Sequence, residues 1–251
     1  MKTKIIAHRG SKSTRSENTL IAFREALHVG SDGIELDVHL SSDGEVVVIH
    51  DETVDRTTNG TGLVRELSLQ ELKSLDAGSW FDPLYSKVTI PTLKEVLDME
   101  VLDMLVAEGF CGLLNIELKT DKIVYPEMSR KVYGLVQEAA PAYDIVYSSF
   151  NYDTLIEMKK INDKNQVALL FKKVGRARMR LNGGYSVEAW HVPVDWAKAR
   201  LILGKPRLPL RVWTVNEKSS IQYFIRKKVA AIITDYPEIA LMIRNHWDKG
   251  E

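Results

Sequence analysis

The sequence has only one cysteine, no excess of either charge and no long apolar run. A lone Cys111 cannot form an internal disulfide, so we expect a small core residue and a reducing compartment such as the cytoplasm. Zero formal net charge argues against duplex nucleic acid as a partner, because counterion release needs a basic surface. Without about 18 consecutive apolar residues, no stable membrane insertion is expected. The short apolar stretch near the amino terminus also predicts no signal peptide.

Segments typical of strands and helices alternate along the 251 residues, a length that suits one large barrel or two ordinary domains. Nine strands are predicted, at residues 4–7, 33–38, 46–49, 113–118, 144–147, 166–171, 186–191, 210–215 and 230–234. If the third is the return arm of a hairpin, eight remain, each followed by a helix or a helix-like segment. This count predicts a single α/β domain over residues 1–251, a TIM (β/α)8 barrel. A doubly wound open sheet is the alternative.

Helices are predicted at residues 20–29, 68–75, 92–108, 126–139, 151–161, 194–203 and 218–228, and from residue 237 onward. Two of them begin with the capping-box pattern, Ser68 with Glu71 and Thr92 with Glu95. Residues 52–91 break the alternation, because they are too long for a plain loop and too short for a domain. We expect a small insertion there, after the hairpin of the second strand. Residues 172–184 are basic and irregular.

An unusual strand at residues 33–38 carries two acids at alternate positions, Glu35 and Asp37. Side chains two apart in a strand share a face, so both carboxylates point the same way. They repel each other unless a cation lies between them, and a hard divalent metal is the usual partner. An exposed acidic strand beside a turn is the alternative interpretation.

The turn signal Asp43–Gly44 follows this strand and leads to His50. A simple hairpin centred on that turn would place position 50 opposite Asp37. Directly opposite residues share a face, so an imidazole is predicted beside the two acids. A slip of one residue would undo this register.

In such a barrel the carboxyl ends of the strands form one site. The polar residues expected there are His8, Arg9, Glu35, Asp37, His50, Glu117, Lys119, Trp213 and Asn216. Burying three carboxylates with these cations at one opening is costly without ligands, so a metal and an anion are expected. Each of these strand ends, taken singly, also has a plainer interpretation. The alternatives are a solvated Arg9 in a loop, an exposed salt bridge at Glu117 and Lys119, and a packing role for Trp213. His191 is interpreted as structural, and His39 is left unassigned.

Together these segments resemble the signature of the glycerophosphodiester phosphodiesterases. The resemblance rests on residues 8–10, 17–19, 33–38, 43–44, 50–51 and 116–119, and it extends to 56–60, 90–93, 148–150, 212–216 and 233–237. It keeps the family order over nearly the whole chain, and residues 51–91 are similar to that family's small insertion. Residues 172–185 match no motif, which leaves substrate preference open.

The resemblance implies a divalent metal, Mg²⁺ or Ca²⁺, held by Glu35, Asp37 and Glu117. It also implies an acid–base pair and a set of substrate-binding residues. The pair is His8 and His50, and Arg9 and Lys119 bind the phosphate, with Trp213 added to the substrate contacts. Which histidine is the acid stays open, as does the choice between water and a neighbouring glycerol hydroxyl as the attacking group.

The activity implied is hydrolysis of a small-molecule glycerophosphodiester to sn-glycerol 3-phosphate and an alcohol. A lysophospholipase D acting on lysophospholipids is the alternative, and an exposed apolar surface on the insertion would favour it, formed by Leu67, Leu72, Trp80 and Phe81. A non-catalytic binding barrel is a third hypothesis, which the presence of both histidines and all three acids disfavours. The sequence does not determine whether the chain forms a homo-oligomer.

Overall fold

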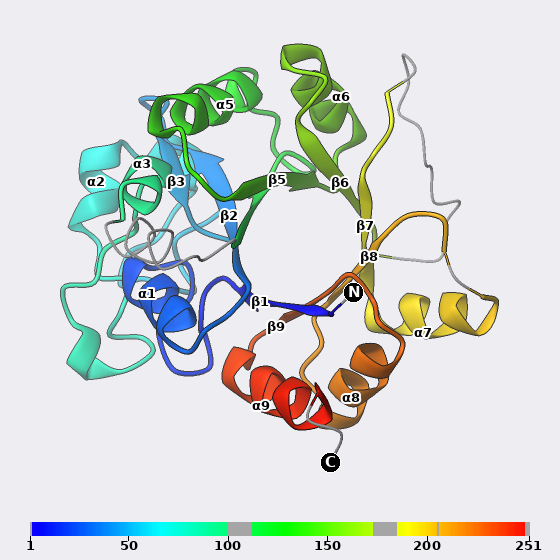
Figure 1. Ribbon diagram of the computed structural model, residues 1–251. Helices are drawn as coiled ribbons and strands as arrows, with labels where there is room; N and C mark the ends of the chain where they lie inside the picture. Colours follow the sequence, from blue (N-terminus) through cyan, green and yellow to red (C-terminus); the bar gives the residue numbers. More distant parts are fainter. Residues whose placement is uncertain (1, 100–111, 173–184, 205, 249–251) are drawn as a thin grey trace.

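The computed structural model of the chain describes residues 2–99, 112–172, 185–204 and 206–248. Cys111, the end of the helix predicted over residues 92–108 and most of the basic segment at 172–184 lie outside the described residues. Figure 1 looks along the axis of a ring of strands, with helices arranged around its outside.

The described residues form one sheet of nine strands that closes on itself. The strands are β1 (Lys4–His8), β2 (Gly33–Leu40), β3 (Val46–Val48), β4 (Leu113–Leu118), β5 (Asp144–Ser149), β6 (Gln166–Leu170), β7 (Ala189–Pro193), β8 (Leu210–Trp213) and β9 (Ala231–Thr234). Strand β1 pairs in parallel with both β2 and β9, which closes the ring. Strand β3 pairs antiparallel with β2 alone among the described strands. The TIM-barrel prediction is therefore confirmed, and the open-sheet alternative is wrong.

The described helices are α1 (Leu20–His28), η1 (Val64–Glu66), α2 (Leu69–Ser74), η2 (Pro83–Tyr85), α3 (Leu93–Leu97), α5 (Met128–Ala139), α6 (Tyr152–Ile161), α7 (Val194–Ile202), α8 (Lys218–Arg226) and α9 (Pro237–Asp248). Both predicted capping boxes are present, at α2 and α3. Helix α3 ends at Leu97 with Asp98 at its C-cap, and residues 100–108 of the predicted helix lie outside the described residues.

Alternation along the strands divides the apolar residues into two layers. Outward-facing residues pack against the helices in one large cluster. Inward-facing residues fill the barrel with a smaller cluster, formed by Ile6, Leu113, Val146, Ala168, Ala189, Ala231 and Ile233, with Trp213 packed against it. On the same inner faces, polar residues follow two positions later, as His8 follows Ile6 and Asn115 follows Leu113. The polar residues therefore lie on a packed layer of buried apolar side chains.

The segment between β3 and α3 has an apolar cluster of its own. Val47, Ile49, Val54, Val64, Leu72, Ala77 and Ile90 are buried together. Two isolated β-bridges, Val47 with Thr92 and Thr53 with Leu63, attach this segment to the sheet and to itself. The cluster fixes residues 52–91 beside β3, where they border the carboxyl ends of the strands.

The predicted hairpin register is wrong by one residue. Val38 pairs with Val48, and the Ile49 N–H donates to the Asp37 carbonyl at 3.1 Å, so position 49 lies opposite Asp37. The turn is longer than a two-residue loop because Gly44 adopts a left-handed conformation, with φ of 83°. His50 still reaches the barrel opening, because β3 ends at Val48 and the chain then leaves the sheet.

Candidate active site

A cavity of about 140 Å³ lies at the carboxyl ends of the barrel strands. Seven of the eight predicted site residues line it: His8, Arg9, Glu35, His50, Glu117, Lys119 and Trp213. Asp37, the eighth, is 1% exposed and is bonded to residues of this wall. The structure therefore brings these eight residues together. Asn216, which was also expected at the opening, does not line the cavity but donates to Asp235 Oδ2 at 2.8 Å.

Three carboxylates from two neighbouring strands meet in this site. Asp37 lies directly opposite Glu117 in the parallel pairing of β2 with β4. Glu35 is two residues earlier on the same face, and oxygen atoms of the three groups lie within 4.8 Å of one another. All three side chains are buried. Among the residues that the structure describes, no other such cluster is present.

Burial and mutual repulsion set the ionisation of this acid cluster. Burial first, and then Asp37, raise the pKa of Glu117 to about 7. Burial, Asp37 and Glu117 raise the pKa of Glu35. Burial would also raise the pKa of Asp37, but Arg9 and Lys119 outweigh it and hold that pKa well below its ordinary value. Two of the three acids thus favour the protonated form unless a further cation joins them.

Two cations bind this cluster from opposite sides. Arg9 Nε lies 3.3 Å from Asp37 Oδ2, and the Arg9 backbone N–H donates to Glu35 Oε2 at 3.0 Å. Lys119 Nζ donates to Glu117 Oε1 at 2.9 Å and lies 3.7 Å from Asp37 Oδ1. Burial lowers the pKa of Lys119, but Asp37 and Glu117 raise it more strongly, so its charge is retained at the cavity wall.

The loop after β1 adopts left-handed backbone conformations at two residues other than glycine. Arg9 has φ of 57° and Asn18 has φ of 55°, which are uncommon for residues other than glycine. At Arg9 this bend points the backbone N–H at Glu35. At Asn18 it allows the side-chain amide to donate to Asp37 Oδ2 at 3.0 Å. Backbone strain is characteristic of functional sites, where surrounding contacts maintain it.

Each of the two predicted catalytic histidines is hydrogen-bonded to a carboxylate through Nδ1. His8 Nδ1 donates to Asp235 Oδ1 at 2.6 Å, and its Nε2 lies 4.0 Å from Glu35 Oε2. His50 Nδ1 donates to Asp51 Oδ1 at 2.5 Å. Burial is the main cause that lowers the pKa of both histidines, so both are neutral at pH 7, with Nε2 as the proton acceptor.

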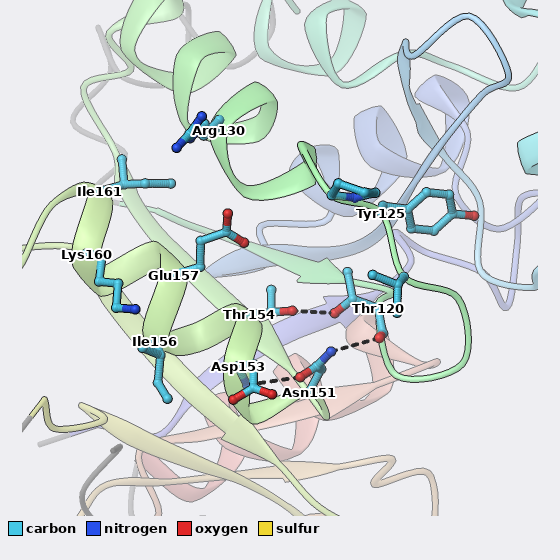
Figure 2. A pocket seen from close by; sticks show the side chains of 12 residues that line it. Thr120, Tyr125, Arg130, Asn151, Asp153, Thr154, Ile156, Glu157, Lys160 and Ile161 are labelled. Carbon is cyan, nitrogen blue, oxygen red and sulfur yellow. Dashed lines mark hydrogen bonds between the residues drawn. The ribbon is translucent and has the colours of Figure 1, made fainter. Parts of the chain in front are cut away.

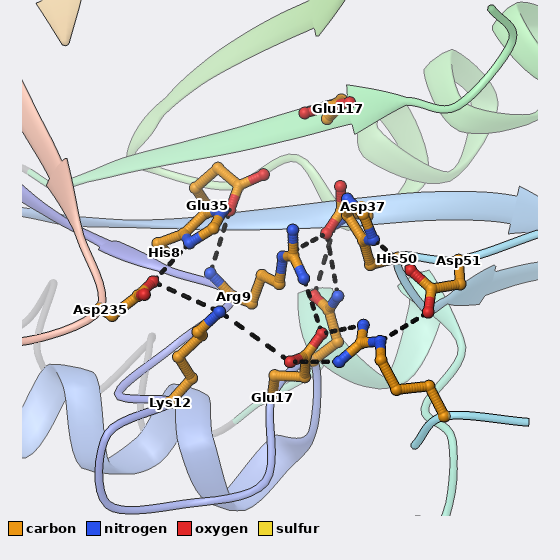
Figure 3. A network of polar contacts seen from close by, with 12 residues as sticks. His8, Arg9, Lys12, Glu17, Glu35, Asp37, His50, Asp51, Glu117 and Asp235 are labelled. Atoms are coloured by element: carbon orange, nitrogen blue, oxygen red, sulfur yellow. Dashed lines mark hydrogen bonds and ion pairs between the residues drawn. The ribbon is translucent and has the colours of Figure 1, made fainter. Parts of the chain in front are cut away.

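Several residues of the site were not assigned a role from the sequence. Arg56 donates to both oxygens of Glu17, at 3.0 and 2.8 Å, and to Asp51 Oδ2 at 2.6 Å. Lys12 lies 3.5 Å from Asp235 and 4.0 Å from Glu17. Figure 3 shows that the dashed contacts of Lys12, Glu17, Asp51 and Asp235 form one network with Arg9, Asp37 and the two histidines, whereas Glu117 stands apart from it. Burial would raise the pKa of Glu17, but Arg56 and Arg9 lower it to about 2.

Two further histidines take positions that the sequence did not reveal. His39, which was left unassigned, is buried and contacts the His50 backbone carbonyl at 3.2 Å and the Tyr125 hydroxyl at 3.0 Å. His191, which was interpreted as structural, lines the cavity itself. His191 has no acidic neighbour in the sequence, so no local signal marked it. His39 lies two residues after Asp37 in β2 and therefore shares the face of the acids, which is the signal that could have found it.

A second, larger cavity of about 950 Å³ lies outside the barrel, between α5 and α6. Figure 2 shows that its side chains carry both charges and are spread along the walls, including Arg130, Asp153, Glu157 and Lys160. As the structure describes it, none of the predicted site residues lines this groove. Convergent titratable groups with perturbed pKa values mark the barrel cavity as the functional site instead.

Comparison with known proteins agrees with this geometry. The sequence matches the model of the glycerophosphoryl diester phosphodiesterase family over residues 8–239. The chain belongs to this family. Two curated glycerophosphodiester phosphodiesterases are similar over almost their full lengths. That of Caldanaerobacter subterraneus subsp. tengcongensis is 38% identical, with 95% of this chain and 96% of that protein covered. That of Bacillus altitudinis is 36% identical, with 96% and 98% covered.

Solved structures of the family share the fold. A glycerophosphodiester phosphodiesterase from Agrobacterium tumefaciens superposes with a TM-score of 0.79 at 29% identity, covering 96% of this chain and 99% of that one. A phosphodiesterase from Oleispira antarctica, in complex with the product sn-glycerol-3-phosphate, superposes with a TM-score of 0.80 at 27% identity, covering 97% of each. Family membership makes the chain an enzyme of the phosphodiesterase class. Across residues 2–99, 112–172, 185–204 and 206–248, no helix has the length and apolarity that crossing a membrane requires.

Proposed function

We propose that this phosphodiesterase hydrolyses glycerophosphodiesters to sn-glycerol 3-phosphate and an alcohol, with the help of a divalent metal. One observation carries the proposal. Three buried carboxylates, two cations and two histidines, each backed by a carboxylate, meet at one cavity. The Oleispira antarctica relative supports the same product, because it was solved with sn-glycerol-3-phosphate.

The acid cluster suits a hard divalent cation. Oxygen atoms of Glu35, Asp37 and Glu117 within 4.8 Å of one another form a donor set without sulfur or nitrogen, which suits Mg²⁺ or Ca²⁺ better than zinc. The raised pKa values of Glu35 and Glu117 indicate that Arg9 and Lys119 alone do not offset the burial and mutual repulsion of the three acids. A metal bound there would supply Lewis-acid polarisation of a phosphoryl oxygen and orient the phosphate.

We propose that Arg9 and Lys119, the two cations that line the cavity beside the acids, bind the phosphate. Arg9 offers a planar fork for two phosphate oxygens, and Lys119 offers a compact point charge. Both are already oriented by carboxylates, so little side-chain entropy is lost when the substrate binds.

The histidines are proposed to exchange protons through Nε2. In each case Nδ1 donates to a carboxylate, Asp235 for His8 and Asp51 for His50, which fixes the tautomer and the ring orientation. One histidine would take the proton of the attacking oxygen, and the other would protonate the leaving alkoxide. The two environments are alike in kind, so the assignment of acid and base stays open.

The attacking group is either water or the glycerol hydroxyl next to the phosphate ester. The second route would pass through a cyclic glycerol phosphate, which phosphorus NMR of a partly completed reaction would detect. Accumulation of that species would identify the hydroxyl route. Its absence under single-turnover conditions would support water.

Hydrolysis of glycerophosphocholine by the purified protein tests the proposal. His50→Ala should lower kcat by about 10²–10⁴-fold, with metal binding largely intact. His28→Ala, which removes an exposed histidine of α1, is the matched control and should leave turnover unchanged. Full activity after treatment with EDTA would reject the metal role, and failure to cleave any glycerophosphodiester would reject the substrate class.

The alternative activity on lysophospholipids gains no support from the insertion. Leu72 is fully buried, and Leu67 packs against the same apolar cluster. Trp80 is 41% exposed, but its ring packs edge-on against Phe81. The continuous apolar surface that a lysolipid chain would need is therefore not formed by these four residues.

We also propose that residues 1–251 act as one domain, with residues 52–91 as an insertion that completes the site. Arg56 supports this, because it bridges Glu17 and Asp51 from within that segment. The single cysteine supports a cytoplasmic location.

A further inference from the structure

Four residues that line the cavity carry a buried polar atom without a hydrogen-bond partner in the part of the chain that the structure describes. One of these atoms, Arg9 Nε, is ion-paired with Asp37 at 3.3 Å, and the other three have neither kind of partner there. They are Asn115 Oδ1, His191 Nδ1 and Trp213 Nε1. Asn115 is 1% exposed and His191 is 0% exposed. Because buried polar groups are costly when unpaired, a cluster of three around one cavity indicates that a ligand completes their hydrogen bonds.

Asn115 lies level with Glu35 in the barrel and one step deeper than Asp37 and Glu117. It is on the inner face of β4, two residues before Glu117 and opposite Glu35 in the sheet. Its side-chain N–H₂ donates to Ser148 Oγ at 3.1 Å, which fixes the amide plane. The carbonyl oxygen is left as an acceptor at the cavity wall.

His191 presents a donor. Arg211 lies opposite it in the pairing of β7 with β8 and donates to Nε2 at 3.1 Å. An arginine can only donate, so Nε2 must be the accepting nitrogen and the proton of the neutral ring must be on Nδ1. Burial and the nearby Arg211 lower the pKa of His191 and favour this neutral form.

Trp213 presents a second donor. Its ring is half-buried at the end of β8 and packs edge-on against Phe150, with ring centres 5.8 Å apart. The indole N–H can only donate, and it is buried without an acceptor among residues 2–99, 112–172, 185–204 and 206–248. The cavity therefore offers two donors and one acceptor beside the acid cluster.

We infer that Asn115, His191 and Trp213 form a subsite for the hydroxyl groups of the glycerol half of the substrate. The inference rests on the proposed function, which places the phosphate at Arg9 and Lys119 in the same cavity. Each hydroxyl both donates and accepts, so a diol can satisfy two fixed donors and one fixed acceptor together. A quaternary ammonium group could use neither donor, and an alkyl chain would leave all three atoms unpaired.

Such a subsite would make the enzyme select glycerol over related alcohols. Sites built to hydrogen-bond a hydroxyl can reject an analogue lacking it by up to about 10⁴–10⁵-fold, because the site's own polar groups are then left unpaired. The three residues thus determine specificity for the glycerol half of the substrate. The alcohol on the other side of the phosphate lies at the cavity opening and is not selected by them.

The test compares glycerophosphocholine with 2-hydroxypropyl phosphocholine, which lacks only the terminal hydroxyl. The analogue keeps the hydroxyl next to the phosphate ester, so either attacking group remains available. The readout is the ratio of kcat/KM for the two substrates. We expect wild-type protein to prefer glycerophosphocholine by about 10²-fold or more.

Two conservative variants remove the donors one at a time. Trp213→Phe keeps an aromatic ring and removes the N–H, and His191→Gln keeps an acceptor for Arg211 and removes the Nδ1 proton. Each should reduce the preference by roughly tenfold, through slower turnover of glycerophosphocholine. Trp190→Phe is the matched control, because Trp190 neighbours His191 but packs outward against Trp196; its ratio should equal that of wild type.

Equal kcat/KM for the two substrates in wild-type protein would overturn the subsite, as would a preference that neither variant alters. If His191→Gln fails to fold, Trp213→Phe alone decides. Failure of the proposed function looks different: neither choline diester would be cleaved, while bis(p-nitrophenyl) phosphate would still be hydrolysed.

Discussion

The raised pKa of Glu117 predicts that metal binding displaces a proton. In the metal-free protein that pKa is about 7, chiefly because of burial and the neighbouring Asp37. A group with this pKa is about 90% protonated at pH 6 and about 10% at pH 8. Since a carboxylate must be ionised to bind Mg²⁺ or Ca²⁺, the apparent affinity should be about tenfold weaker at pH 6 than at pH 8.

Isothermal titration calorimetry measures this linkage directly. Repeating the titration in buffers of different ionisation enthalpy gives the number of protons released per metal, expected to be about 0.9 at pH 6 and about 0.1 at pH 8 for Glu117 alone. The pKa of Glu35 is raised as well, which can only add to the release. Burial lowers the pKa values of His8 and His50 from their ordinary value, which reduces their share of the protons exchanged at pH 8.

The same shift fixes how the stability of the metal-free protein depends on pH. The folded-state pKa of Glu117 is raised from 4.5 to about 7, so the folded protein binds the proton more tightly than the unfolded chain does. Stability is therefore highest below pH 4.5 for this group and is lost as pH rises through 7, by about 3 kcal/mol.

Glu117→Gln is the matched variant, because it removes the titrating group and keeps the shape. It should weaken metal binding, release fewer protons and flatten the loss of stability in the presence of chelator. A wild-type affinity that does not change between pH 6 and pH 8, with no dependence of the heat on the buffer, would refute this account of the acid cluster.

Three further outcomes follow from contacts around the site and the insertion. Asp235→Asn should lower kcat by about 10²–10⁴-fold with unchanged metal affinity in calorimetry, because it removes the carboxylate that orients His8. Between pH 4.5 and pH 2, protonation of Glu17, whose pKa is lowered from 4.5 to about 2, should remove about 3 kcal/mol of stability in urea titrations; Glu17→Gln should therefore lose about that much less than wild type over this range, since only the other low-pKa carboxyls still titrate. Leu72→Ala should cost about 2–5 kcal/mol by opening a cavity in the apolar cluster of the insertion, which a lower Tm would show.

Local patterns predicted the barrel and the acidic strand because both depend on periodicity alone. Alternating acids at Glu35 and Asp37 share a face in any strand, and the count of strand and helix segments already implied closure. The capping boxes at α2 and α3 are also local, and both were confirmed. Such features need no knowledge of which distant segments meet.

The hairpin register and the ionic network depend on features beyond local pattern. The register changed by one residue because Gly44 accepts a left-handed conformation that lengthens the turn. Arg56 bonds Glu17 across 39 positions, and Asp235 bonds His8 across 227. These pairs lay inside segments that the sequence had marked, yet only the closed barrel shows that they are neighbours.

Closure also explains why polar groups can be buried so densely at this opening. Below them, Ile6, Leu113 and the other inner residues exclude water, which strengthens every charge interaction above. Repulsion between the three carboxylates then disfavours the state in which all of them are ionised, as the raised pKa values of Glu35 and Glu117 indicate. A layer of small and branched apolar side chains beneath the acids thus strengthens their mutual repulsion, from which the predicted proton linkage follows.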